Sequence, residues 1–286
     1  MASMRDIKRR IKSVNSTQQI TKAMNLVASS KLTRARNRLL DTRPFFNETR
    51  SVIAELINSS GSISNPFLEK RDVKNCIVIL ITGDRGLCGG YNVNISKLAM
   101  NYAEKGKAKA VTIGSKGRDY LKRRNVEIIK SFTGISENPK YSDAQEISKL
   151  VIDMFTKGET DEVYIAYTEF KSTISHEPKL VKLLPADADD FKTEKDKDGV
   201  SALTIYEPSE EAVLEYVIPK YVNTVIFGAM VESAVCELGA RMTAMDSATD
   251  NAADMIDTLN LLYNRARQGA ITQEITEIVS GSGIYD

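Results

Sequence analysis

The residues most suggestive of chemistry form a glycine-rich run, Gly83–Gly90, which directly follows an apolar stretch. A glycine-rich turn between a strand and a helix is a common phosphate site, because backbone N–H groups and the helix dipole point toward the ligand. The run matches neither GxxxxGKS/T nor GxGxxG, and it contains no lysine and no hydroxyl residue to hold a triphosphate and magnesium. A tight turn with closely packed backbone is the preferred interpretation, and a phosphate ligand stays open as the alternative.

The acidic residues, cysteines and histidine elsewhere in the chain lack the spacing of known metal or catalytic sites. The acidic segment Asp187–Gly199 departs from the EF-hand spacing and has no glycine at the sixth position, so a solvated charged loop is predicted rather than a calcium site. The three cysteines, Cys76, Cys88 and Cys236, are far apart and lack metal-ligand spacing. The single histidine, His176, has no neighbouring thiol or triad motif. We therefore expect no catalytic residue, no metal site and no bound cofactor.

The charge of the chain is divided between its two ends. The net charge is +1, but residues 1–40 contain ten Lys and Arg against the single acid Asp6, whereas residues 225–286 contain nine acids against three Arg. No aromatic residue precedes Phe45 to stack on bases, so a protein partner is preferred to nucleic acid for the basic end. The longest apolar stretch, Tyr221–Val231, has only 11 residues. A membrane-spanning helix needs about 20, so no membrane span is predicted.

Both ends of the chain follow the pattern of long amphipathic helices, which would position the side chains that they carry. The N-terminal apolar or small residues, mostly three or four positions apart, are Ile7, Ile11, Val14, Ile20, Met24, Val27, Ala28, Leu32, Ala35 and Leu39. This stripe shifts near Gln18 and becomes small and polar through Thr17 and Thr21. The C-terminal stripe is Ile226, Met230, Ala234, Leu238, Arg241, Met245, Ala248, Ala252, Met255, Leu259, Leu262 and Ala266. Steps of four and three are typical of a left-handed coiled coil, and the opposite charges favour an antiparallel pair. The stretch from about 210 to 279 would be on the order of 100 Å long, so part of it must project.

The centre of the chain alternates between strand and helix patterns. Cys76–Thr82 is a continuous β-branched run of the kind buried on both faces in a parallel sheet. The other predicted strands are Lys109–Gly114, Val126–Lys130, Glu162–Thr168, Lys179–Leu184 and Ala202–Tyr206, and the predicted helices are Asn92–Lys105, Ser115–Arg124 and Asp143–Thr156. The predicted fold class is α/β: a long antiparallel coiled coil of the terminal helices plus a central Rossmann-like parallel sheet with an antiparallel edge. The expected domains are a shaft helix at 1–58, an α/β domain at 70–208 and a second shaft helix at 209–286, paired with 1–58.

Four segments of the sequence resemble the gamma subunits of F-type ATP synthases. They are the N-terminal string Ile11–Met24, the turn Ile81–Gly90, the segment Arg241–Ala252 and the terminal segment Ala266–Val279. They occur in the family's order and cover both ends and the centre of the chain. Two departures are Gly83, where serine is more usual, and the tail Ser282–Asp286, where relatives tend toward alanine.

The resemblance implies a non-catalytic rotor shaft. Its terminal helices would turn inside a ring of alternating alpha and beta subunits, and its α/β domain would bind epsilon and the membrane c-ring. It would couple ion flow to ATP synthesis or hydrolysis from a peripheral position on the cytoplasmic face of a bacterial cell membrane. Residue by residue, the resemblance assigns partner-contact and coupling roles to Met24, Arg241, Arg267, Gln268, Thr272, Glu274 and Glu277. For Met24 and Arg241, a role in stabilising the coil is equally open, and for Arg267 and Gln268 a role as solvated helix surface stays open.

Two other classes of function stay open at this point. An α/β enzyme would use the turn Gly83–Gly90 for a phosphate ligand, and the isolated chain would then bind nucleotide. A coiled-coil adaptor would bind nucleic acid through residues 1–40 in a salt-dependent way. Neither alternative accounts for the acidic C-terminal helix, the small seam residues Ala248 and Ala252 and the four matching segments together.

Overall fold

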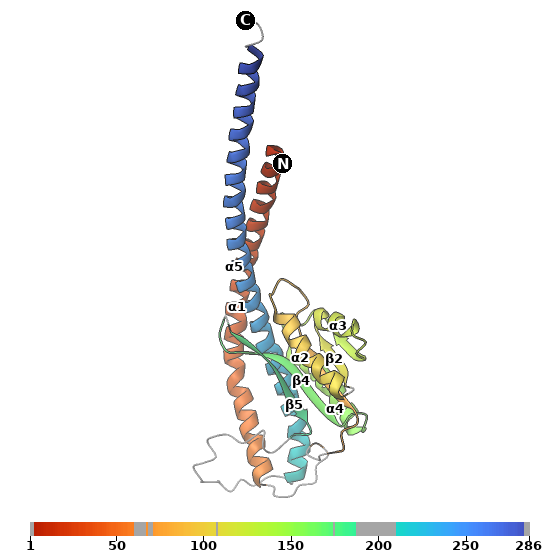
Figure 1. The fold of residues 1–286 in the computed structure, drawn as a ribbon. Helices are drawn as coiled ribbons and strands as arrows, with labels where there is room; N and C mark the ends of the chain where they lie inside the picture. The colour runs from red at the N-terminus through yellow and green to blue at the C-terminus, as the bar shows by residue number, and fades with distance from the viewer. Residues whose placement is uncertain are drawn as a thin grey trace. The chain divides into compact units, whose positions relative to one another are not determined.

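The computed structural model describes residues 3–59, 67, 71–106, 108–173, 175–186 and 210–282. The chain forms two compact units, one of Met1–Ser29 with Arg241–Asp286 and the other of Ser30–Ala240. We call the first the coil unit and the second the sheet unit. Two long helices, α1 at Met4–Ser59 and α5 at Glu210–Ser282, contribute to both units (Figure 1).

Helix α1 begins with a side-chain cap. The Asp6 N–H donates to Ser3 Oγ at 3.3 Å, and the Ser3 hydroxyl donates to Asp6 Oδ2 at 2.9 Å. This reciprocal pairing satisfies a backbone donor that has no partner inside the first helical turn. The helix then continues for 56 residues, with Pro44 inside it. The absence of glycine before residue 61 agrees with this uninterrupted helix.

The sheet unit contains a five-stranded sheet in the order β3-β2-β1-β4-β5. Its strands are β1 at Cys76–Ile81, β2 at Lys109–Ile113, β3 at Ile128–Phe132, β4 at Glu162–Phe170 and β5 at His176–Leu184. The first four are mutually parallel, and β5 pairs antiparallel with β4. The predicted parallel sheet with an antiparallel edge is therefore confirmed.

Strand β1 lies at the centre of the core because both of its faces are covered. Its alternating residues point to opposite sides, and all six are buried. One side packs with α4, Tyr141–Thr156, and with the part of α5 between Ile218 and Met230. The other side packs with α2, Tyr91–Gly106, and with Leu121 of α3, the helix at Ser115–Lys122. Figure 1 shows these layers, with α2 in front of the sheet.

Strand β3 begins two residues later than the sequence predicted. Asn125 has a positive φ of 57°, and the N–H of Val126 donates to the carbonyl of Leu121 at 3.3 Å. Val126 therefore belongs to the turn that closes α3, and it is not available to the sheet ladder. The predicted strand Ala202–Tyr206 and the predicted charged loop Asp187–Gly199 lie outside the described residues.

Part of α5 is apolar enough to resemble a membrane span. The helix contains an 18-residue window within Glu215–Ser280 that meets the length and composition of such a span, but most of that window is buried inside the protein. Val222, Ile226 and Met230 pack in the sheet core. The core of the sheet unit thus accounts for the hydropathy of this stretch.

Candidate functional site

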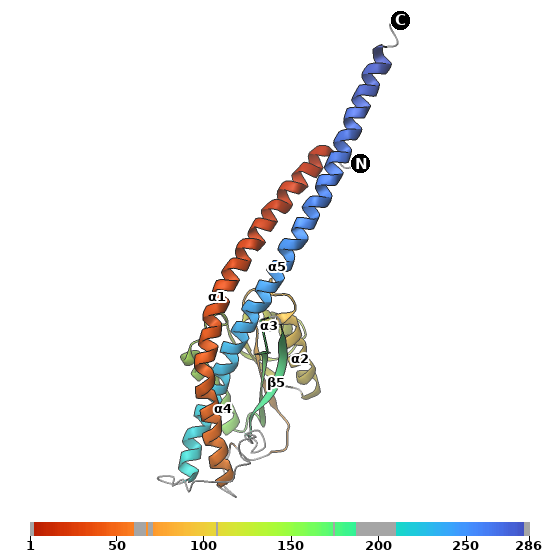
Figure 2. The ribbon, with the colours of Figure 1, turned by 90° about the vertical axis from the view of Figure 1, so that its left-hand side faces the viewer.

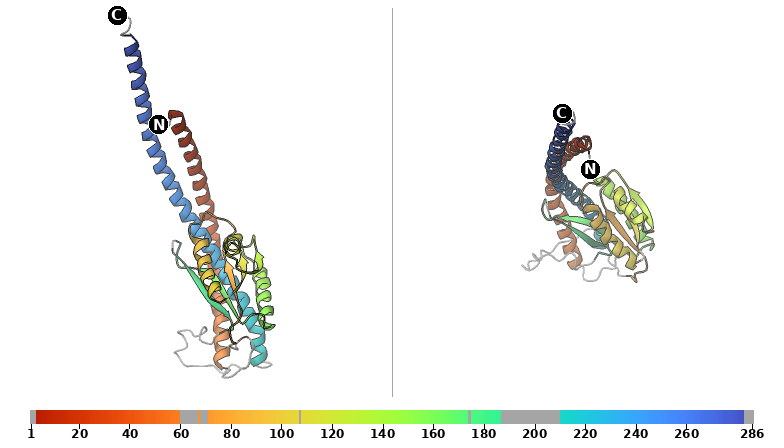
Figure 3. Two further views of the ribbon diagram at one scale, coloured as in Figure 1. Left: turned by 45° about the vertical axis from the view of Figure 1, so that its right-hand side comes forward. Right: turned by 45° about the horizontal axis from the view of Figure 1, so that its top comes forward.

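The candidate partner-contact residues all fall in the coil unit. There, the N-terminal part of α1 lies antiparallel beside α5, and α5 continues past the N-terminus of α1 (Figures 2 and 3). On α1, the side chains that are buried or half-buried at steps of four and three are Ile7, Ile11, Val14, Gln18, Thr21, Asn25 and Ala28. This regular spacing confirms the coiled coil and defines its seam.

Polar bonds hold the two helices together at the middle of the coil. The hydroxyl oxygens of Thr21 and Thr249 lie 2.8 Å apart. The amide of Asn25 donates to the Met242 carbonyl at 3.1 Å and to Asp246 Oδ1 at 3.3 Å. Short polar side chains bring the helix backbones close but bury little apolar area. The pairing here is thin, and its register depends on directional bonds.

The seam differs from its predicted course at four positions. Ile20, Val27, Met255 and Leu262 were assigned to it but are exposed, Ile20 at 60%. The positions that take their place are Gln18, Thr21 and Asn25 on α1, and Ile256 and Tyr263 on α5. A small and polar stripe was predicted at Thr21, whereas Asn25, whose amide also bonds across the coil, was not assigned to the seam.

Met24 and Arg241 lie at or beside this seam. Arg241 is only 7% exposed and takes part in interactions within the protein. Met24 is half-buried and adjacent to Asn25, which bonds across the coil. A buried arginine needs partners to offset its desolvation, so its surroundings constrain the local geometry. Both positions suit a role in the coil, and the contact role of each stays a prediction.

The other candidate residues lie on the exposed end of α5. Arg267, Gln268, Thr272, Glu274 and Glu277 are all exposed. Two of their hydrogen bonds are local, because Thr272 donates to the Gln268 carbonyl at 2.9 Å and the Gln273 amide donates to Glu277 at 2.9 Å. Such bonds leave most of the polar capacity of these side chains available to a partner.

An apolar stripe on the same helix end was missed by the sequence reasoning. It consists of Ile271, Ile275, Ile278 and Val279, and Ile278 is 70% exposed. At about 3.6 residues per turn, these side chains share one side of the helix with Arg267 and Gln268, while Gln273 and Glu277 point to the other side. The spacing of the isoleucines is visible in the sequence, but the resemblance assigned roles only to the polar residues beside them. A contiguous exposed apolar face indicates a protein contact.

The glycine-rich turn belongs to the sheet unit, and its position for an anion is already filled. Asp84 follows β1, and its Oδ1 accepts from the Ser115 N–H at 3.0 Å. Its Oδ2 accepts from the Gly134 N–H at 2.8 Å and from the Ser136 hydroxyl at 2.9 Å. Ser115 is the first residue of α3, after β2, and Gly134 and Ser136 lie on the loop after β3. These donors are at the carboxyl edge of the sheet, where a ligand binds in open α/β folds. The chain's own carboxylate occupies that place.

The remainder of the turn is closely packed at Gly83 and Gly90, as predicted, but a Cβ on Gly86 or Gly89 would meet no atom closer than 4.0 Å. A Cβ on Gly83 would lie 2.6 Å from the carboxyl carbon of the buried Glu237, so a larger residue there requires the Glu237 side chain to shift. Leu87 has a positive φ of 60° and is 62% exposed. Left-handed backbone is costly for a leucine, and such strain is often found where a loop contacts a ligand or partner. The turn therefore presents an apolar side chain outward.

The thiols and the imidazole of the sheet unit are buried or half-buried. Cys76, Cys88 and Cys236 are free thiols and are buried, and burial raises the pKa of Cys76. His176 is half-buried, and burial lowers its pKa. Across the described ranges, no group of three His, Cys, Asp or Glu residues could hold a metal ion.

Comparisons with known proteins agree over the whole chain. The family model described as ATP synthase matches residues 3–283. The ATP synthase gamma chain of Alkaliphilus metalliredigens is 50% identical and aligns over 98% of this chain and 97% of its own length. The sodium ion specific ATP synthase gamma chain of Acetobacterium woodii is 48% identical, with 98% of each chain aligned.

Two solved structures of ATP synthases contain chains that are similar to this one. A chain of the central stalk and c-ring of the Tetrahymena thermophila mitochondrial ATP synthase has a TM-score of 0.64 and 27% identity, and the match covers 80% of this chain and 99% of that chain. A chain of the Euglena gracilis mitochondrial ATP synthase has a TM-score of 0.67 at 16% identity, covering 98% and 93%, and so shares the fold.

Proposed function

This chain belongs to the ATP synthase gamma family, and on that premise we propose that its coil unit is the part that turns against the catalytic ring. As a gamma chain, it is a central-stalk rotor subunit of an F-type ATP synthase. The complex couples ion flow through its membrane sector to ATP synthesis or hydrolysis, and the rotor contacts both the catalytic ring and the c-ring.

The observation that carries this proposal is the exposed end of α5. Residues 271–280 are exposed without exception, yet they include the isoleucine stripe, and the exposed Arg267 and Gln268 one turn earlier lie on the same side of the helix. Covering one exposed isoleucine contributes about 1.5–3 kcal/mol, which suits an obligatory contact. The guanidinium fork of Arg267 and the amide of Gln268 add directional bonds at the edge of this face.

Asymmetry of the shaft would convert rotation into changes at the ring. One side of the α5 end is apolar and the other carries Gln273 and Glu277. As the shaft turns, each surrounding subunit meets first one side and then the other, and a state that binds one side better is favoured in turn. The thin polar seam at Thr21 and Asn25 keeps the shaft narrow. Met24, Arg241, Thr272 and Glu274 are proposed to take part in these contacts.

The chain itself is proposed to be non-catalytic. Asp84 occupies the anion position of the sheet, and the turn lacks a lysine and a hydroxyl for triphosphate and magnesium. The purified chain should therefore neither bind nor hydrolyse ATP in calorimetric and phosphate-release assays. Micromolar ATP affinity that disappears when Gly86 and Gly89 are replaced would contradict this proposal.

The placement of the subunit follows from its family. The chain is part of a membrane-associated ATP synthase complex. We propose that it lies peripherally on the cytoplasmic face of a bacterial cell membrane. Its sheet unit is proposed to bind the epsilon subunit and the c-ring. The strained, exposed Leu87 supports a protein contact on this unit.

The proposal is tested in the assembled complex reconstituted into vesicles. Replacing Ile275 and Ile278 with serine, or Arg267 and Gln268 with alanine, should lower ATP-driven ion pumping more than ATP hydrolysis. The matched control is Gln273→Ala, which lies on the opposite side of the same exposed helix end and should leave both rates unchanged. Circular dichroism of the purified chains should show equal helicity.

Two results would contradict the contact role. Normal pumping and normal assembly in both double variants would leave the exposed face of α5 without a function in coupling. An equal loss in Gln273→Ala would show that any change near the end of the helix disturbs the complex, independent of the side on which it lies.

A further inference from the structure

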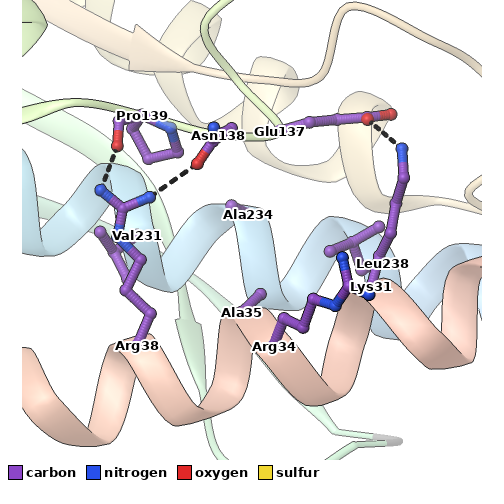
Figure 4. A pocket seen from close by; sticks show the side chains of 10 residues that line it. All are labelled: Lys31, Arg34, Ala35, Arg38, Glu137, Asn138, Pro139, Val231, Ala234 and Leu238. Carbon is purple, nitrogen blue, oxygen red and sulfur yellow. Dashed lines mark hydrogen bonds and ion pairs between the residues drawn. The ribbon is translucent and has the colours of Figure 1, made fainter.

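The sheet unit contains a cavity of about 350 Å³ that none of the functions above uses. It lies between α1, α5 and the loop at residues 137–139 that precedes α4 (Figure 4). Its apolar floor is formed by Ala35, Val231, Ala234 and Leu238. A cavity of this size is at the lower end of the range for small-molecule sites.

The wall of the cavity is cationic. Lys31, Arg34 and Arg38 come from successive turns of α1, and Glu137 is the only carboxylate among the described residues that line the cavity. Lys31 pairs with Glu137 at 2.7 Å. Arg38 donates to the Asn138 side chain at 2.8 Å and to the Pro139 carbonyl at 2.6 Å. The loop therefore fixes two of the cations.

Arg34 is different, because no hydrogen bond or ion pair to it occurs among the described residues. It is exposed, and it lies between the two fixed cations along α1. Three cations against one carboxylate leave the wall with an excess of positive charge, and the guanidinium of Arg34 has all five donors available. Arginine presents these donors in a planar fork that binds carboxylate or phosphate in a bidentate way.

We propose that this cavity binds a small organic anion, with a phosphate or carboxylate head on Arg34 and a short apolar body on the floor formed by Ala35 and Ala234. A water molecule takes up about 30 Å³ in the liquid, so the cavity has room for a ligand of about a dozen non-hydrogen atoms. Such a ligand has the size of phenyl phosphate. A phospholipid acyl chain with its head group is larger, so the source is a soluble molecule rather than a membrane. The inference is independent of the contacts proposed for the coil unit.

The test is calorimetric titration of the full chain with phenyl phosphate as the probe. Arg34→Gln should weaken binding roughly tenfold or more, because it removes a charge-assisted fork. Arg36→Gln is the matched control, since Arg36 is exposed on the same helix but does not line the cavity. It should leave the affinity unchanged. Circular dichroism checks that each variant keeps its helicity.

A second variant separates the cavity from a simple surface charge. Ala35→Leu fills the floor and keeps Arg34, so phenyl phosphate should bind at least tenfold more weakly while inorganic phosphate is unaffected. Benzyl alcohol, which has the body without the anion, should bind more weakly than phenyl phosphate to the unmodified chain.

Three outcomes would overturn the proposal. Equal affinity of the unmodified chain and Arg34→Gln would remove the role of the guanidinium. An equal loss in Arg36→Gln would indicate nonspecific attraction to a basic helix. Flotation with vesicles of anionic phospholipid, without measurable binding of phenyl phosphate, would show a lipid surface to be the ligand.

Discussion

The carboxylate of Asp84 occupies the place of an anion at the carboxyl edge of the sheet. We predict that the substitution Asp84→Ala destabilises the fold strongly. The carboxylate accepts three hydrogen bonds, from the N–H groups of Ser115 and Gly134 and from the hydroxyl of Ser136, at 2.8–3.0 Å. A hydrogen bond to a charged group contributes about 1.5–3 kcal/mol, but Asp84 is only half-buried and water replaces part of the loss. We therefore expect the free energy of unfolding to fall by about 2–4 kcal/mol. Asp84→Asn, which keeps one acceptor oxygen, should lose about half as much.

The assay is urea unfolding of the full chain, followed by tyrosine fluorescence. Asp119→Ala is the control, because its carboxylate pairs at the surface with its neighbour Arg118 and should contribute less than about 1 kcal/mol. Formate has the size of the deleted carboxylate, so it should stabilise Asp84→Ala. At about 100 mM formate and a dissociation constant of about 10 mM, the free energy of unfolding of Asp84→Ala would rise by about 1.4 kcal/mol.

Two results would refute this reasoning. If the free energy of unfolding of Asp84→Ala falls by less than about 0.5 kcal/mol, water replaces the three hydrogen bonds without cost. Equal stabilisation of the unmodified chain by formate, compared with the same concentration of chloride, would show that the anion acts elsewhere.

Three further predictions concern particular residues. Gly114→Ala should cost more than about 3 kcal/mol, because its φ is 90° and a Cβ would lie 2.2 Å from a backbone oxygen, whereas Gly134→Ala, with a φ of 80° but open space, should cost only about 1–2 kcal/mol; urea unfolding measures both. Thr21→Val and Thr249→Val should each destabilise the coil, and a double-mutant cycle by thermal circular dichroism should give a coupling of about 0.5–1.5 kcal/mol, since the two hydroxyls bond each other. Additive losses would exclude that bond. Burial lowers the pKa of His176, so the unfolded chain binds the proton more readily; stability should be complete above about pH 6.5 and fall as the pH drops below it. His176→Gln should flatten that dependence in unfolding measured between pH 7.5 and 5, and an unchanged slope would contradict the assignment.

Much of the fold could be predicted from the sequence where local pattern and packing agree. The β-branched run that became β1 was placed to within one residue, because its burial on both faces requires that composition. The start of β3 was misplaced because Asn125 adopts a left-handed turn that no periodicity reveals. Asn25 was left out of the predicted seam because its bonds depend on the partner helix.

The sites were less predictable than the fold, because they depend on residues far apart in the chain. The donors to Asp84 are about 30 to 50 positions away, and only the order of β1, β2 and β3 in the sheet brings them together. The cavity at Arg34 likewise combines α1, α5 and the loop before α4. By contrast, the isoleucine stripe beginning at Ile271 is local in sequence. It could have been found from its helical spacing alone.

The central claim is that this chain turns within the complex and does no chemistry itself. Its most direct test is single-molecule observation of the assembled catalytic ring, held by its catalytic subunits, with an optical probe on the sheet unit of this chain. The account predicts that added ATP drives sustained rotation of the probe in one direction, and that rotation stops when ATP is exhausted. Hydrolysis of ATP at the full rate by complexes whose probe stays fixed would contradict it.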